Sequence, residues 1–177
     1  MYFDILKKVV DWIGVLSTKV GLRMGAGVNQ IGLGRKHLME SIDKQLKRLK
    51  TDYIDLYQIH RLDNITPLEE VLDTLTEIRK AGKILYIGCS TMPAYKFAQL
   101  LTLAECKGYA RPIAMQNLYN LIQRDEEREM IPLCVDAGVG LIPYSPLARG
   151  VLARNRVGGG VGETERAKYD KGLKTGA

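Results

Sequence analysis

The chain has 177 residues and a formal net charge of +6, with 46% hydrophobic and 26% charged residues, values typical of an ordinary soluble globular domain. No apolar run is long enough to cross a bilayer, and the first residues lack the apolar stretch of a secretory signal, so we expect a cytoplasmic protein that binds no membrane. Cys89, Cys106 and Cys134 are far apart and match no metal-ligand spacing, so we predict three packing residues, with neither disulfides nor a metal site.

A short β-rich apolar run at residues 13–18 predicts the first strand, and a Gly- and Asn-containing loop over 21–34 follows it. The next segment predicts a helix, because its large apolar residues recur at helical spacing. These positions are Leu38, Ile42, Leu46 and Leu49. The same helix carries the basic residues Lys36, Lys44, Lys47 and Arg48. It lacks the interleaved aromatic residues that a nucleic-acid surface uses, so we interpret the basic cluster as a solvent-exposed face and expect no nucleic-acid partner.

Residues 53–59 predict a second strand, and Thr66-Pro67 predicts a helix start with Thr66 as the N-cap and Pro67 in the first turn. An apolar stripe continues this helix until Gly82. Further strands are expected at 84–88, 112–116 and 139–143, and further helices at 94–106 and 125–137. Acidic residues at the start of the last helix suit its dipole. From residue 154 onward the chain is rich in Gly, Lys and Arg and loses periodicity, which predicts a flexible tail over 154–177.

Strands that alternate with amphipathic helices imply parallel βαβ units in an α/β fold. Two architectures fit this pattern, an open doubly wound sheet and part of a closed barrel, and periodicity does not distinguish them. In both, functional residues gather at the carboxyl ends of the strands. The polar residues at the five predicted strand ends are Lys19, His60, Ser90 with Thr91, Gln116 with Asn117, and Tyr144 with Ser145. Each alone fits a packing or capping role, but together they predict a ligand site at one edge of the sheet.

The motifs around these strand ends resemble those of the aldo-keto reductases, in the order and at the spacing of that family. They are Ser17-Thr-Lys19-Val-Gly, Asp55-Leu-Tyr-Gln-Ile-His60-Arg-Leu-Asp63, Gly82-Lys-Ile-Leu-Tyr-Ile-Gly-Cys-Ser90, Met115-Gln-Asn-Leu-Tyr-Asn120 and Pro143-Tyr-Ser-Pro-Leu-Ala-Arg-Gly150. The segment from Asn120 to Pro132 is similar to the microbial and fungal branch that includes the aryl-alcohol dehydrogenases. The resemblance implies that residues 1–177 form one partial (β/α)₈ TIM barrel domain, covering its third to seventh strands.

The resemblance also implies an NADP(H)-dependent oxidoreductase, which transfers a hydride to a small aldehyde or ketone or from an alcohol. In such an enzyme Lys19 lowers the pKa of a catalytic tyrosine, and His60 orients the carbonyl oxygen. The implied cofactor-binding residues are Ser90, Thr91 and Gln116 at the nicotinamide carboxamide, Tyr144 against the ring, and Ser145, Leu147, Arg149 and Gly150 along the pyrophosphate.

One motif of the family does not occur in the 177 residues: the Asp-Thr-Ala-x-x-Tyr segment that carries the catalytic aspartate and tyrosine. We therefore expect the isolated chain to be weakly active or inactive. Two alternatives stay open, a non-enzymatic cofactor-binding subunit of the same superfamily and a truncated gene product without an independent role. Because part of a barrel leaves two sheet edges unpaired, oligomerisation through these edges is a further expectation.

Overall fold

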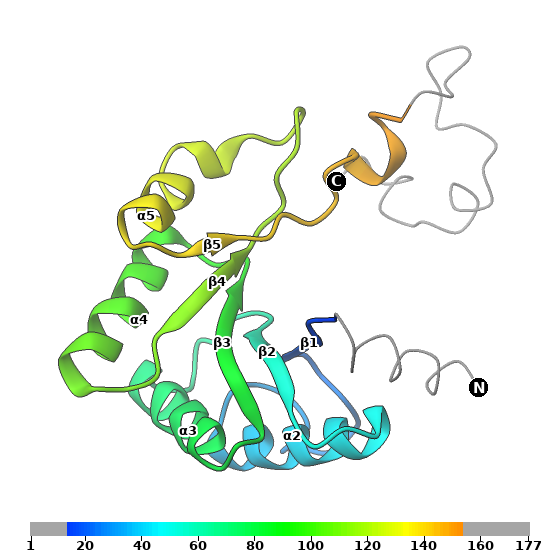
Figure 1. The fold of residues 1–177 in the computed structure, drawn as a ribbon, viewed down its shortest axis with the longest axis vertical. Coiled ribbons are helices and arrows are strands. Elements are labelled where there is room, and N and C mark those ends of the chain that lie inside the picture. The colour runs from blue at the N-terminus through cyan, green and yellow to red at the C-terminus, as the bar shows by residue number, and fades with distance from the viewer. Residues whose placement is uncertain (1–13, 154–177) are drawn as a thin grey trace.

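The computed structural model describes residues 14–153, in which five parallel strands form one curved sheet (Figure 1). The strands are β1 (Ser17–Val20), β2 (Ile54–Ile59), β3 (Ile84–Ser90), β4 (Pro112–Gln116) and β5 (Gly140–Leu141). Their order in the sheet equals their order in the chain. A doubly wound sheet reverses its strand order at a switch point, whereas a (β/α)₈ barrel places each strand beside the next. The fold is therefore part of a barrel, which the described strands do not close.

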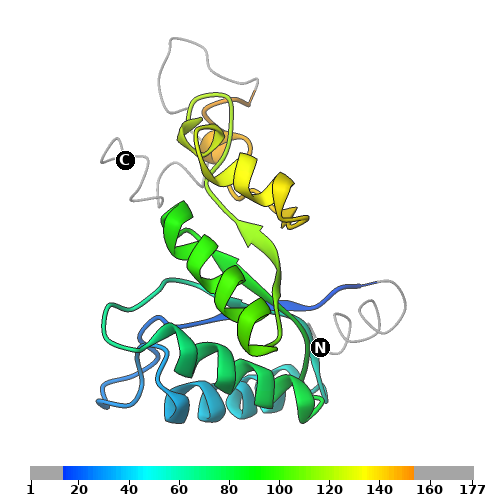
Figure 2. The ribbon, with the colours of Figure 1, turned by 90° about the vertical axis from the view of Figure 1, so that its left-hand side faces the viewer.

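Four helices cover one face of this sheet, as Figure 1 shows and as Figure 2 shows from the helical side. They are α2 (Arg35–Leu49), α3 (Leu68–Lys80), α4 (Ala94–Lys107) and α5 (Met130–Asp136), with short 3₁₀ turns η1 (Asp125–Glu127) and η2 (Ala148–Gly150). In a barrel, the covered face is the outer one and the opposite face lines the interior. We call these two sides the outer face and the inner face.

The hydrophobic core lies between the outer face and the helices. Tyr57 and Ile59 of β2 are fully buried against it, and so is Phe97 of α4. Thr18 of β1 has the same orientation, because its hydroxyl donates a 2.8 Å hydrogen bond to the side-chain oxygen of Gln45 on α2. Side chains alternate between the faces of a strand, so the neighbours of these residues point to the inner face.

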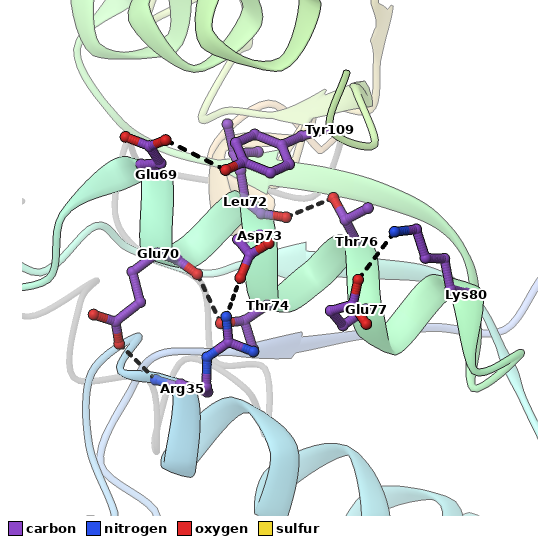
Figure 3. Close-up of polar contacts among 10 residues, drawn as sticks. All are labelled: Arg35, Glu69, Glu70, Leu72, Asp73, Thr74, Thr76, Glu77, Lys80 and Tyr109. Atoms are coloured by element: carbon purple, nitrogen blue, oxygen red, sulfur yellow. Dashed lines mark hydrogen bonds and ion pairs between the residues drawn. The ribbon is translucent and has the colours of Figure 1, made fainter. Parts of the chain in front are cut away.

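Polar contacts join α3 to the helices on both sides of it (Figure 3). Arg35, the first residue of α2, forms an ion pair with Asp73, and its backbone N–H donates to Glu70 at 3.0 Å. On the other side, Glu69 forms an ion pair at 3.2 Å with Lys107, the last residue of α4, and accepts a 3.3 Å hydrogen bond from the Tyr109 hydroxyl just after that helix. Exposed pairs of this kind contribute little stability each, at most about 1 kcal/mol. They join α3 to both of its neighbours, beyond the apolar packing beneath them.

All five predicted strands form, and their boundaries shift most at the two ends of the sheet. β4 has the predicted bounds, and β2 begins one residue later than predicted. β1 covers Ser17–Val20 instead of 13–18, and β5 has only two residues. Both are edge strands with one partner each. Beyond the two residues of β5, the backbone N–H groups of Ile142 and Tyr144 still donate to the carbonyls of Met115 and Asn117. The predicted tail at 154–177 lies outside the described residues.

The prediction that Thr66 caps α3 with its side chain is wrong. Pro67 occupies the N-cap position, and no side chain caps the helix. The Thr66 hydroxyl instead donates to the carboxylate of Asp63 at 2.9 Å. Because α3 begins at Leu68, Thr66 lies one position before the N-cap, and its side chain bonds to the preceding loop instead of to the helix.

The single helix predicted over 125–137 is also wrong, because the segment divides into η1 and α5. Glu129 separates them, with non-helical backbone angles of φ −136° and ψ −52°. Pro132 gives the physical reason. It has no N–H to donate to the carbonyl four residues earlier, so a continuous helix would lose that bond. With α5 beginning at Met130, Pro132 falls in the first turn, where no such bond is made.

The cysteines differ in their surroundings. Cys89 and Cys134 are buried in the core, as predicted, whereas Cys106 is exposed on α4, so the packing prediction is wrong for that residue. Within residues 14–153, no three His, Cys, Asp or Glu side chains are grouped as metal ligands. No helix in the same range has the length and apolar composition to span a membrane.

Candidate active site

The ends of β1 and β2 bring the two predicted catalytic residues to one edge of the sheet. Lys19 pairs in register with Gln58, and register partners in a parallel sheet share a face. His60 lies two residues after Gln58 and follows the same alternation, and its backbone N–H donates to the Val20 carbonyl at 2.8 Å. Both side chains are half-buried. Lys19 and His60 are therefore neighbours on the inner face at the carboxyl edge.

The electrostatic surroundings of His60 keep its imidazole neutral. Partial burial lowers the pKa of His60 below its usual value, and the positive charges of Lys19 and Arg61 lower it further. Since the ordinary value lies near 6.5, the lowered pKa leaves the ring uncharged at pH 7. A neutral imidazole still has one N–H to donate, so His60 is suited to orient a carbonyl oxygen rather than to protonate it.

Arg61 is a residue whose position the sequence did not predict. Its guanidinium donates to the backbone carbonyls of His60 and Thr91, both at 3.3 Å. It therefore joins the loop after β2 to the loop after β3. The sequence shows only that Arg61 follows His60, and this position does not indicate a contact with the Thr91 carbonyl.

The ends of β3 and β4 form the second part of the site. Ser90 pairs in register with Gln116, and its hydroxyl donates to the Gln116 carbonyl at 2.9 Å. Gly88 lies in register with Gln58, so Ser90, two residues later, faces the inner side with His60. Gln116 shares that face with Ser90. The backbone N–H of Thr91 donates to the same Gln116 carbonyl at 3.1 Å, where the chain turns away with φ +27°.

The hydroxyl groups at this edge fit the carboxamide of a nicotinamide ring. Ser90 gives its proton to a backbone carbonyl, which leaves its oxygen free to accept an amide N–H. The Thr91 hydroxyl oxygen is buried and has no hydrogen-bond partner among the described residues, so it can donate to an amide oxygen. Asn117, by contrast, follows Gln116 onto the opposite face. It is 3% exposed, and its two amide atoms have no partner within residues 14–153.

Tyr144 is held beside the end of β4. Its backbone N–H donates to the Asn117 carbonyl at 2.8 Å, and it forms an isolated parallel bridge with Leu118. The following residue, Ser145, has φ +53°, and its carbonyl accepts a 3.1 Å hydrogen bond from Asn120. These contacts place Tyr144 and Ser145 next to the Ser90–Gln116 pair along the carboxyl edge.

The turn after Ser145 contains the other predicted pyrophosphate residues. Leu147 is 57% exposed, and Arg149 is exposed with φ +54°. The backbone N–H of Gly150 already donates to the Leu147 carbonyl at 2.8 Å. The Gly150 amide proton is therefore already used within this turn.

Asp63 is a second residue whose position the sequence did not predict, and it fixes the loops beside His60. Its carboxylate accepts hydrogen bonds from the backbone N–H groups of Leu33, Ile65 and Thr66 at 2.6, 3.1 and 2.6 Å, and from the Thr66 hydroxyl. Burial alone would raise the pKa of Asp63, but the hydrogen bonds from Thr66, Leu33 and Ile65 outweigh it and lower this pKa. The carboxylate thus joins the loop before α2 to the loop before α3.

We expect Asp63→Asn to lower the free energy of unfolding by about 1–3 kcal/mol at pH 7, because hydrogen bonds to a charged acceptor are lost. A lowered pKa stabilises the folded state above the ordinary aspartate pKa, and this stabilisation is lost as the pH falls through the folded value. The difference between the two proteins should therefore be full at pH 7 and shrink below about pH 4, near the ordinary aspartate pKa. Urea unfolding at several pH values measures it.

The matched control is Asp52→Asn, since Asp52 is exposed and none of the described contacts involves its side chain. This variant should unfold like the wild type at every pH. A loss of stability for Asp63→Asn that persisted unchanged to pH 3 would contradict the assignment of the effect to the ionised carboxylate.

A partial (β/α)₈ barrel with these groups at its carboxyl edge defines the class of the protein. Residues 14–173 match the aldo/keto reductase family, and the chain belongs to that family. It is 52% identical over 130 residues to the versiconal hemiacetal acetate reductase of Aspergillus parasiticus, covering 73% of this chain and 38% of that protein.

A second relative is a Schizosaccharomyces pombe protein that carries an aryl-alcohol dehydrogenase name. It is 44% identical over 181 residues, which cover 99% of this chain and 51% of that protein. A third, the aldo-keto reductase dtxS3 of Metarhizium robertsii, is 51% identical over 127 residues, covering 72% and 34% of the two chains. These relatives confirm the fungal branch expected from the sequence. The chain spans between a third and about half of the length of these curated relatives.

Proposed function

We propose that this chain carries the lysine–histidine part and the nicotinamide-binding edge of an NADP(H)-dependent aldo-keto reductase site. The parent reaction is hydride transfer to the carbonyl carbon of a small aldehyde or ketone, or from the corresponding alcohol. The observation that carries this proposal is the placement of Lys19, His60, Ser90 and Gln116 on one face, at one edge of the sheet. When bound, the reduced nicotinamide supplies the hydride.

The protein groups would orient the reactants and stabilise charge. The neutral His60 imidazole donates its N–H to the carbonyl oxygen and holds the carbonyl carbon toward the ring. Lys19 supplies a positive charge beside the oxygen, where negative charge develops during hydride transfer. Ser90, Thr91 and Gln116 hold the carboxamide and thereby fix which face of the ring is presented. The names of the relatives, with an aryl-alcohol dehydrogenase among them, support a small-molecule carbonyl or alcohol as the substrate class.

A second candidate is a cofactor-binding protein without turnover. The sequence favours it in one respect, because the carboxamide-binding edge is present while no Asp-Thr-Ala-x-x-Tyr segment occurs in the 177 residues. Both candidates require that the chain binds a nicotinamide dinucleotide, so binding is the first property to test.

We expect the 177-residue chain to bind NADP⁺ measurably in isothermal titration calorimetry. Gln116→Leu should raise the Kd about two- to tenfold, as the loss of one hydrogen bond does. Gln99→Leu is the matched control, because Gln99 is exposed on α4, away from the carboxyl edge, and it should leave the Kd unchanged. A parallel titration with NAD⁺ tests the preference for the phosphorylated dinucleotide. Absence of binding by the folded chain, or an equal effect of Gln99→Leu, would count against the proposed site.

A further inference from the structure

A second hollow lies beside this edge, between the loop after β2 and the loop after β3. Its volume is about 400 Å³, and it is lined by residues 61–68, by Thr91, Met92 and Pro93, and by Tyr95 and Lys96. Thr91 belongs both to the carboxyl edge described above and to this lining, whereas Lys19, His60, Ser90 and Gln116 are not in the lining. We infer that this hollow is a separate binding site for a small organic anion, namely a carboxylate attached to an apolar body.

Two positive charges from different elements face the hollow. The Arg61 guanidinium is fixed by its hydrogen bonds to the carbonyls of His60 and Thr91. The Lys96 ammonium comes from the first turn of α4 and lies 5.5 Å from the centre of the Tyr95 ring. Neither cation forms an ion pair within residues 14–153, so both charges are available to an anion.

The lining also contains one carboxylate, Asp63, whose negative charge repels an anion. Its oxygens already accept four hydrogen bonds, from the backbone N–H groups of Leu33, Ile65 and Thr66 and from the Thr66 hydroxyl. These donors stabilise the ionised form, so Asp63 keeps its negative charge, and the two positive charges of Arg61 and Lys96 exceed it by one.

The lining also offers apolar walls. The apolar walls are formed by Leu62, Ile65, Pro67, Leu68, Met92, Pro93 and Tyr95. Ile65 is 92% exposed and Tyr95 is 60% exposed, which leaves apolar surface uncovered at the rim. In addition, α4 begins at the hollow without an acidic residue in its first turn, so the positive end of its dipole favours an anion there.

These features together select the ligand class. The volume suits a small molecule, because ligand pockets begin at about 300 Å³. An inorganic anion would contact the cations but leave the apolar walls bare, and a neutral aromatic compound would leave two cations without a partner. A carboxylate on an aromatic or other apolar body uses both parts of the lining.

The test is an NMR titration of the ¹⁵N-labelled 177-residue chain with benzoate at constant ionic strength. We expect saturable shifts in the amides of residues 61–68 and 91–96. Benzamide, a neutral compound of the same shape, should bind at least about fivefold more weakly, because it loses the charged interactions. Inorganic phosphate should also bind at least about fivefold more weakly, because it leaves the apolar walls in water.

Variants at two lysines distinguish a specific site from general attraction of anions to a basic protein. Lys96→Gln should weaken benzoate binding about five- to tenfold, and Lys96→Arg should largely restore it. Lys47→Gln makes the same change of charge at an exposed position of α2, outside the hollow, and should have no effect. The amide spectrum of each variant shows directly whether it is folded.

Equal binding of benzamide and benzoate, or equal weakening by Lys47→Gln, would overturn the role of the two cations. Phosphate binding as tight as that of benzoate would overturn the apolar part of the assignment, and shifts that do not saturate would overturn the site itself. The inference does not depend on the proposed function. Benzoate binding without any NADP⁺ binding would support the hollow and contradict the nicotinamide site, and the reverse result would do the opposite.

Discussion

The 177-residue chain is expected to reduce benzaldehyde with NADPH at least about 100-fold more slowly than a full-length aryl-alcohol dehydrogenase of the same family. Lys19 and His60 can orient a carbonyl and stabilise negative charge, but the 177 residues contain no Asp-Thr-Ala-x-x-Tyr segment to supply the tyrosine that acts as general acid in the family. The lowered pKa of His60 leaves it neutral at pH 7. Loss of one general acid removes about 10²–10⁴ in rate. The loss of nicotinamide absorbance at a fixed protein concentration measures the rate.

The Lys19→Met variant tests whether the turnover of the 177-residue chain comes from a complete catalytic group. Because the proposed role of the lysine charge is to stabilise the developing negative charge, Lys19→Met should lower the slow residual rate further. Rapid turnover by the wild-type chain that Lys19→Met abolished would show that the chain contains a complete catalytic group, and the expectation would be wrong.

The second large effect concerns the core beneath α4. Phe97 is fully buried between this helix and the outer face of the sheet. Phe97→Ala should lower the free energy of unfolding by about 3–5 kcal/mol, because it removes a large apolar side chain and leaves a cavity. Urea unfolding followed by circular dichroism measures the change.

Tyr95 provides the matched control on the same helix, since it is an aromatic residue that is 60% exposed. Tyr95→Ala should change stability by no more than about 0.5 kcal/mol. Similar losses for both variants would show that α4 does not pack on the sheet in the way described.

The sequence predicted best those elements whose signals are local. The helix at 35–49 follows from its apolar spacing, and the strand at 112–116 lies between a helix-ending glycine and a polar turn. The choice between a barrel and a doubly wound sheet had no local signal, because it depends on which strands become neighbours. The division of the 125–137 segment did have a local signal, Pro132. The acidic residues before it favoured instead a single helix that begins at Asp125.

In the candidate site, too, residues with a local sequence signal were predicted and contacts between distant segments were not. Lys19, His60, Ser90 and Gln116 were predicted because each ends a strand and lies in a family motif. Strand register then places all four on the inner face. The bridge made by Arg61 and the loop contacts of Asp63 were not predicted, because they depend on how two loops fold against each other.

The consecutive order of the strands has a consequence for how the chain folds. Each strand pairs with the one that follows it, so forming each pair closes a loop of one helix and its connections. The entropy lost on closing a loop rises slowly with its length, so every pairing of this sheet has a similar cost, and no step waits for a distant segment. The sheet can therefore grow by one strand and one helix at a time. A chain made of a few such units can reach its own packed state before the rest of a barrel is present.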